Sequence, residues 1–209
     1  EVIQTIEKYN LVAVPVVDSI GRLVGRITVD DVMDEVREQA ERDYQLASGL
    51  SQDVETDDSV FRQTTARLPW LLIGMLGGIG NSMILGNFDS TFAAHPEMAL
   101  YIPLIGGTGG NVGTQSSALV VQGLANSSLD ANNTWKQILK ESVVALINAT
   151  IISMLVYVYN FIRFGATATV SYSVSLSLFA VVMFASIFGT LVPMTLEKMK
   201  IDPAIATGP

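Results

Sequence analysis

The residues best suited to chemistry in this chain are five glycines and two side-chain amides between Pro103 and Gln115. The glycines fill five of the eight positions from 106 to 113, and Asn111 and Gln115 supply the amides. Each glycine weakens a helix by roughly 1 kcal/mol relative to alanine. The stretch lies in an uncharged segment, Met98–Leu129, and irregular backbone at membrane depth is tolerated only in protein or beside a wet cavity. The composition favours two interpretations: a broken helix whose carbonyls and amides face an ion or substrate, or intact helices packed through small residues.

A second group with chemistry is a row of acidic side chains in the N-terminal third. Its members, spaced by three, four and three residues, are Asp31, Asp34, Glu38 and Glu41. This spacing places them on one face of the helix that we expect over residues 31–45. Like charges at such spacings repel by roughly a few tenths of a kcal/mol per pair. Either a cation neutralises the row, or it is a solvated face with Arg37 and Arg42 as local partners.

Composition divides the chain into an acidic head and a membrane-like remainder. The chain has 209 residues, of which 49% are hydrophobic, and residues 1–68 hold 14 of its 20 acids and 7 of its 12 bases. An acidic head argues against nucleic acid as a partner and favours cations. The chain has no cysteine, which excludes a thiolate metal site. Four uncharged runs, 68–88, 98–129, 142–162 and 164–196, hold no His, Asp or Glu for acid–base chemistry, so we expect no enzyme.

Short β elements precede the acidic helix. We expect strands at residues 11–17 and 23–29, separated by a turn, and Asp30 as the helix N-cap. This order resembles the C-terminal part of an α/β CBS domain, on the residues Val14–Asp18, Gly21–Gly25 and Ile27–Asp31. In that resemblance Thr28 and Asp31 match positions that bind nucleotide ribose. We favour the alternative, in which Thr28 ends a strand and Asp31 lies in a first helical turn, because half of the nucleotide pocket is missing.

Four apolar runs are long enough to cross a membrane, which takes about 20 residues. We expect spans at about 68–88, 98–125, 139–163 and 170–196. Basic residues fall almost entirely on one side of such a membrane: Arg62, Arg67, Lys136, Lys140, Lys198 and Lys200. The other side has Arg163 alone. The positive-inside rule then places the N-terminal region in the cytoplasm.

Together these features resemble the MgtE family of magnesium channels or transporters. The most specific part is Gly109-Gly110-Asn111-x-Gly113-x-Gln115. Supporting blocks are Arg67–Leu72, Leu124–Ala125, Leu139–Glu141 and Ile201–Ala204. The resemblance implies a mainly α fold: a polytopic α-helical membrane domain (68–209), an acidic linker and connecting plug helix (35–67), and the C-terminal part of a CBS domain (1–34). It also implies a homodimer with five spans per subunit, in the inner cell membrane among lipid.

The same resemblance assigns roles to particular residues. The pore or filter residues would be Gly106, Gly109, Gly110, Asn111 and Gln115. The acids that sense cytosolic Mg²⁺ and close the pore would be Glu38, Glu41 and Asp43, with Asp31 and Asp34 nearby. Mg²⁺ would be both transported and regulatory ion, and ATP or another adenine nucleotide could occupy a complete CBS domain.

We expect the chain to end before the fifth span, which carries the family's pore aspartate. Two alternatives stay open: a secondary transporter of another divalent cation, such as Co²⁺ or Mn²⁺, whose midplane site is the glycine break, and a non-conducting regulatory membrane protein.

Overall fold

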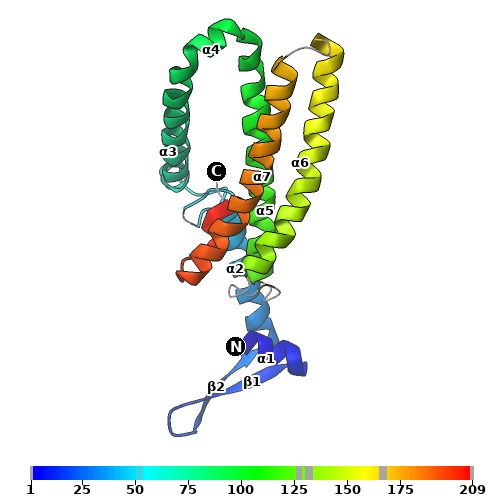
Figure 1. Ribbon diagram of the computed structural model, residues 1–209. Helices are drawn as coiled ribbons and strands as arrows, with labels where there is room; N and C mark the ends of the chain where they lie inside the picture. The colour runs from blue at the N-terminus through cyan, green and yellow to red at the C-terminus, as the bar shows by residue number, and fades with distance from the viewer. Residues whose placement is uncertain (1, 52, 126–128, 130–133, 165–168, 208–209) are drawn as a thin grey trace. The chain divides into compact units, whose positions relative to one another are not determined.

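The computed structural model describes residues 2–51, 53–125, 129, 134–164 and 169–207 (Figure 1). The chain forms two compact units, Glu1–Gln45 and Leu46–Pro209. Helices account for most of the described residues, and the strands among them form one two-stranded sheet. The prediction of a mainly α fold is confirmed.

The N-terminal unit begins with helix α1 (Val2–Tyr9), followed by strands β1 (Ala13–Val17) and β2 (Leu23–Thr28). The strands pair antiparallel. In the turn between them, the Asp18 carboxylate accepts hydrogen bonds from two backbone N–H groups at 3.0 and 2.8 Å. Gly21 in the same turn has a φ of +80°, a left-handed conformation that glycine adopts without steric cost.

Helix α2 (Val29–Ala47) follows directly from β2. The prediction that Asp30 caps this helix is wrong, because Thr28 and Asp31 close its first turn together. The Asp31 carboxylate accepts hydrogen bonds from the backbone N–H of Thr28 at 2.8 Å and from its hydroxyl at 2.6 Å. The Asp31 N–H lies 3.4 Å from the same hydroxyl oxygen. This reciprocal pairing of residues three apart is the arrangement of a capping box.

The second unit contains five α-helices among its described residues. They are α3 (Val60–Leu85), α4 (Asp89–Ala94), α5 (Ile102–Ala125), α6 (Thr134–Phe164) and α7 (Thr169–Lys198). Short 3-10 helices lie at Gly86–Phe88, Pro96–Tyr101 and Pro203–Thr207. In Figure 1, α5 and α7 run in the same direction and α6 runs against them.

Three described segments are long and apolar enough to cross a membrane: Val60–Ala94, Thr134–Arg163 and Thr169–Lys198. Helix α5 has 24 residues, which is sufficient length, but its glycines and polar side chains lower its hydropathy. The start of α3, the start of α6 and the end of α7 lie at the same end of this unit (Figure 1). The basic residues of these three helix ends therefore share one side, as the charge pattern predicts.

Helix α3 runs unbroken through Pro69 and begins at Val60. The expected boundary between a connecting helix and a first span, at residues 67 and 68, is therefore not a helix end. Ser59 caps the helix, since its side chain accepts a hydrogen bond from the Arg62 N–H. Ala66 is the buried residue of α3, and most of the large apolar side chains of this helix lie exposed.

Of the two interpretations of the glycine stretch, the broken helix is wrong, because α5 is a continuous helix over that region. Pro103 is the second residue of α5, in the first turn, where a backbone N–H has no intrahelical partner and proline is tolerated. The low helix propensity of the glycines is a weak preference that tertiary packing overrides. That packing is against α7, as shown below.

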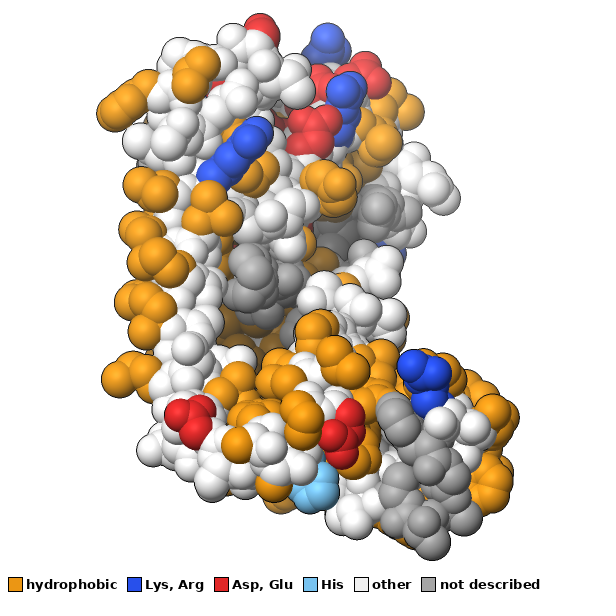
Figure 2. Space-filling view, turned by 90° about the horizontal axis from the view of Figure 1, so that it is seen from above, with side chains coloured by type: hydrophobic (Ala, Val, Ile, Leu, Met, Phe, Trp, Pro, Cys, Tyr) orange, Lys and Arg blue, Asp and Glu red, His pale blue; other side chains and the backbone are white. Residues whose placement is uncertain are grey.

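The core of this unit lies among α5, α6 and α7. Ala149 of α6 packs with Leu178 and Val182 of α7, and all three are fully buried. A smaller cluster joins Tyr101 to Val170 and Val174. Hydrophobic side chains also cover much of the face in Figure 2, whereas charged side chains gather at a few places on it. Such an exposed apolar surface fits a protein that lies in a membrane.

Candidate functional site: the seam between two helices

The glycine stretch meets α7 at a seam too close for larger side chains. A Cβ atom added to Gly109 would lie 2.6 Å from Val181 Cγ1. A Cβ atom added to Gly189 of α7 would lie 2.6 Å from the Gly113 carbonyl oxygen and 3.0 Å from Ser116 Cβ. Small residues thus let the two backbones approach each other, which is a recurrent device between membrane helices.

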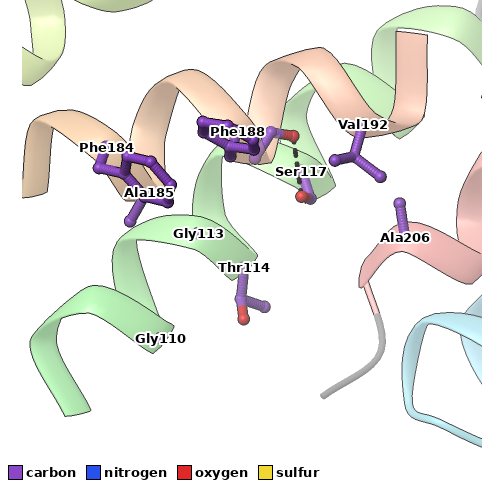
Figure 3. A pocket seen from close by; sticks show the side chains of 10 residues that line it. Gly110, Gly113, Thr114, Ser117, Phe184, Ala185, Phe188, Val192 and Ala206 are labelled. Carbon is purple, nitrogen blue, oxygen red and sulfur yellow. Dashed lines mark hydrogen bonds between the residues drawn. The ribbon is translucent and has the colours of Figure 1, made fainter. Parts of the chain in front are cut away.

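Hydrogen bonding reinforces the seam one turn further along. The Ser117 hydroxyl of α5 donates to the Gly189 carbonyl of α7 at 2.8 Å, and Ser117 is buried. Beside this bond lies a cavity of about 430 Å³, whose α5 wall includes Gly110 and Thr114. Figure 3 shows Phe184 and Phe188 of α7 on its opposite side. The two rings stack with their centroids 4.2 Å apart and form an apolar wall of the cavity.

The structure does not bring the five predicted filter residues to one surface. Gly110 lines the cavity beside α7, whereas Gln115 lines a separate cavity of about 370 Å³ beside α6. Gly109 packs against α7. Gly106 and Asn111 are exposed, and a Cβ atom added to Gly106 would meet nothing within 4 Å. The stretch therefore has one packed side and one open side.

Sequence reasoning missed Glu141, which lies in the third turn of α6. Its Oε1 atom accepts hydrogen bonds from the hydroxyls of Ser116 on α5 at 2.7 Å and Ser186 on α7 at 2.6 Å. The available signal was a single acid at the edge of an apolar run, next to Lys140. Nothing in that local pattern indicates a partner on another helix, yet the side chain bridges three helices.

Two members of the acidic row on α2, Glu38 and Glu41, pair with arginines of the same helix, as does the neighbouring Glu35. The Arg42 guanidinium contacts Glu38 at 2.6 Å and Glu35 at 3.3 Å, and Arg37 contacts Glu41 at 3.0 Å. The side chains of these glutamates are about 60% exposed: 60, 61 and 62%. Among the described residues, no group of three or more His, Asp or Glu side chains is arranged to hold a metal ion. Glu38 and Glu41 therefore lie at the surface, each beside an arginine of its own helix.

Hydrogen bonding lowers the pKa of Asp31 below its ordinary value. The hydroxyl of Thr28 contributes most, followed by its backbone N–H, and Arg26 adds a smaller electrostatic effect. These bonds favour the ionised carboxylate. Thr28 ends β2 and Asp31 lies in the first turn of α2, which are the places that the structural interpretation of these two residues expected.

Comparison with known proteins agrees with this architecture. Residues 102–209 match the family described as "MgtE: Divalent cation transporter", and residues 1–38 match the CBS domain. The chain is similar to proteins named magnesium transporter MgtE. It is 32% identical to the one from Bacillus subtilis over 209 residues and 34% identical to the one from Thermus thermophilus over 215. In both cases the whole chain aligns with 46% of the relative, so it spans about half of their length.

The matched family covers more than half of the chain, including α5, α6 and α7. The helical seam, the apolar helices and the N-terminal β elements therefore have one common explanation: the chain belongs to the MgtE family.

Proposed function

We propose that this chain forms part of a divalent-cation channel or transporter in the inner cell membrane, with Mg²⁺ as the transported ion. Its partners would be a second copy of the chain and membrane lipid. The observation that carries the proposal is α5, with one side packed on α7 and the other side open. The names of the similar proteins, each a magnesium transporter, support the choice of ion.

An intact α5 changes how the glycines would act on an ion. Among the described residues, no atom lies within 4 Å of a Cβ atom added to Gly106, Gly107 or Gly110, so none of their side chains covers the backbone there. A helical carbonyl oxygen keeps a second lone pair after its helix bond. Mg²⁺ dehydrates reluctantly and keeps several waters. Carbonyl oxygens and the exposed Asn111 amide would thus accept hydrogen bonds from the water shell of the ion.

The test is Mg²⁺ uptake into proteoliposomes by the full-length protein with Asn111→Ala. We expect slower uptake and weaker discrimination against Co²⁺ and Mn²⁺, because an oxygen ligand of the water shell is lost. Asn87→Ala is the matched control. The Asn87 amide donates a hydrogen bond at 2.9 Å to the Met83 carbonyl, four residues earlier in the chain, and it is not a proposed filter residue. Unchanged uptake and selectivity in Asn111→Ala would refute the filter role.

The same test separates the alternatives. A wild-type protein that moves Co²⁺ or Mn²⁺ and excludes Mg²⁺ would be a transporter of another cation. A wild-type protein that transports none of these cations would be a non-conducting regulatory membrane protein. The argument for a midplane site at a broken helix no longer holds, because α5 is continuous.

For regulation, we propose that cytosolic Mg²⁺ binds Glu38, Glu41 and Asp43, with Asp31 and Asp34 nearby, and closes the pore. Support comes from the exposure of the two glutamates, 61 and 62%, which leaves them accessible to a hydrated cation. Mg²⁺ would have to displace the arginines that contact them. Since a single α2 helix presents no closed metal site, ligands from a second surface would complete the coordination.

Patch recording of the full-length protein tests this sensor. We expect a Glu38→Ala, Glu41→Ala double variant to stay open at Mg²⁺ concentrations that close the wild type. Glu35→Ala is the matched control, because Glu35 also contacts Arg42 but is not a proposed ligand. Normal closure of the double variant would exclude the sensor role. A cytoplasmic N-terminal region is part of this proposal, and adenine-nucleotide binding by a complete CBS domain remains a prediction.

A further inference from the structure

Glu141 is an acidic side chain among three apolar helices, and the pore assignment above does not use it. It is half-buried, one residue before an uncharged run of 21 residues, 142–162. An ionisable group at such a place is costly to bury and is usually functional in membrane proteins. Among the described residues, no lysine or arginine lies within ion-pair distance of it.

The hydrogen-bond partners of Glu141 are two neutral side chains, one on α5 and one on α7. Ser116 is 4% exposed and Ser186 is 1% exposed, and both hydroxyls donate to the same Oε1 atom. The two hydroxyl oxygens are 3.1 Å apart. Buried hydroxyls need partners, and a carboxylate oxygen can accept two bonds while donating none. One atom of α6 therefore fixes α5 relative to α7.

The location of Ser116 links this network to the proposed filter. Ser116 directly follows Gln115 and is five residues after Asn111 on the same helix. A Cβ atom added to Gly189 would lie only 3.0 Å from the Cβ atom of Ser116, so Ser116 also belongs to the seam with α7. Because a helix is rigid over two turns, the rotation of α5 at Ser116 determines where Asn111 faces.

We propose that Glu141 is a positioning residue for ion selectivity: through Ser116 and Ser186 it holds α5 in the rotation that presents Asn111. This inference rests on the proposed function. Loss of the carboxylate charge would weaken both hydroxyl bonds, since charge-assisted bonds are roughly twice as strong as neutral ones. The helix would then turn about its axis while remaining packed through its glycines.

The test compares cation selectivity with folding in the full-length protein. Uptake of Mg²⁺ and of Co²⁺ into proteoliposomes is measured for Glu141→Gln, Ser116→Ala and the double variant. The matched control is Ser142→Ala, because the Ser142 hydroxyl donates at 2.8 Å to Ile138 within α6. Thermal unfolding in detergent is measured on the same samples.

We expect the Mg²⁺/Co²⁺ uptake ratio to fall by about three- to tenfold in each single variant, since small misplacements of binding groups have effects of this size or larger. The double variant should show no further fall, because both changes break one network. Ser142→Ala should keep the wild-type ratio.

An unchanged ratio in Ser116→Ala and Glu141→Gln, with or without a lower Tm, would overturn the proposal and leave a purely structural role. If Glu141→Gln does not fold, Ser116→Ala decides alone. Additive changes in the double variant would also overturn it. A wild-type protein without Mg²⁺ uptake would instead refute the proposed function, which separates the two failures.

Discussion

Gly189→Ala is the most direct perturbation of the seam between α5 and α7. The new Cβ atom would lie 2.6 Å from the Gly113 carbonyl oxygen, whereas ordinary contact begins at 3.4 Å. The difference, 3.4 − 2.6, requires the backbones to separate by about 0.8 Å. The atom in the way belongs to the backbone, so no side-chain rotation relieves the contact. The 2.8 Å bond from Ser117 would lengthen to about 3.6 Å, beyond hydrogen-bond range.

These changes can be converted to a free energy of unfolding. Overpacking costs about 1–3 kcal/mol, and loss of a hydrogen bond costs about 0.5–1.5 kcal/mol. Replacing glycine by alanine within a helix stabilises the helix by about 1 kcal/mol, which offsets part of these costs. The sum predicts a net destabilisation of about 0.5–3.5 kcal/mol, and each kcal/mol lowers Tm by roughly 2–4 °C in a domain of this size.

The assay is thermal unfolding of detergent-solubilised protein, followed by loss of the monodisperse elution peak. Gly107→Ala is the matched control, because Gly107 lies in α5 and an added Cβ atom meets nothing within 4 Å. We expect Gly107→Ala to keep or raise Tm. A Gly189→Ala protein as stable as the Gly107→Ala protein would refute the close-packing account of the glycine stretch.

Two further predictions concern other contacts. Since the folded-state pKa of Asp31 is lowered, its contribution to stability is present above its ordinary pKa of 3.8 and is lost as pH falls through the folded pKa. Asp31→Asn should therefore remove this acid sensitivity of the N-terminal unit, measured by circular dichroism between pH 5 and about 2. Ser117→Ala should destabilise the helical unit by about 0.5–1.5 kcal/mol, and an unchanged Tm would show that the Gly189 carbonyl finds another donor.

The sequence was sufficient for the elements with strong patterns. Helices α6 and α7 cover the expected spans 139–163 and 170–196, because long uncharged runs have few other structures. The strands on both sides of Gly21 were likewise expected, and they form one hairpin. In each case a local signal, apolar length or turn chemistry, specifies the element.

The features that needed the structure depend on contacts between distant residues. Whether Gly109 breaks a helix or packs against one depends on Val181, 72 positions further along the chain. Propensity alone favoured a break, and tertiary packing reversed it. Glu141 was missed for the same reason: a carboxylate beside two lysines, Lys136 and Lys140, looks solvated until the serines of two other helices are placed around it.

An intact α5 also explains why the stretch needs more glycines than a helix–helix seam alone. Gly109 and Gly113 face α7, and Gly189 completes their contact from the other helix. Gly106, Gly107 and Gly110 make no such contact with the described residues, so packing among those residues does not account for them. The intact helix already pairs its backbone groups internally, but each carbonyl oxygen keeps a second lone pair that the water around a cation would reach where no side chain covers it. A second copy of the chain would instead pack on the same strip through the small residues. Under the proposal above, either contact needs the rotation of α5 that Glu141 holds.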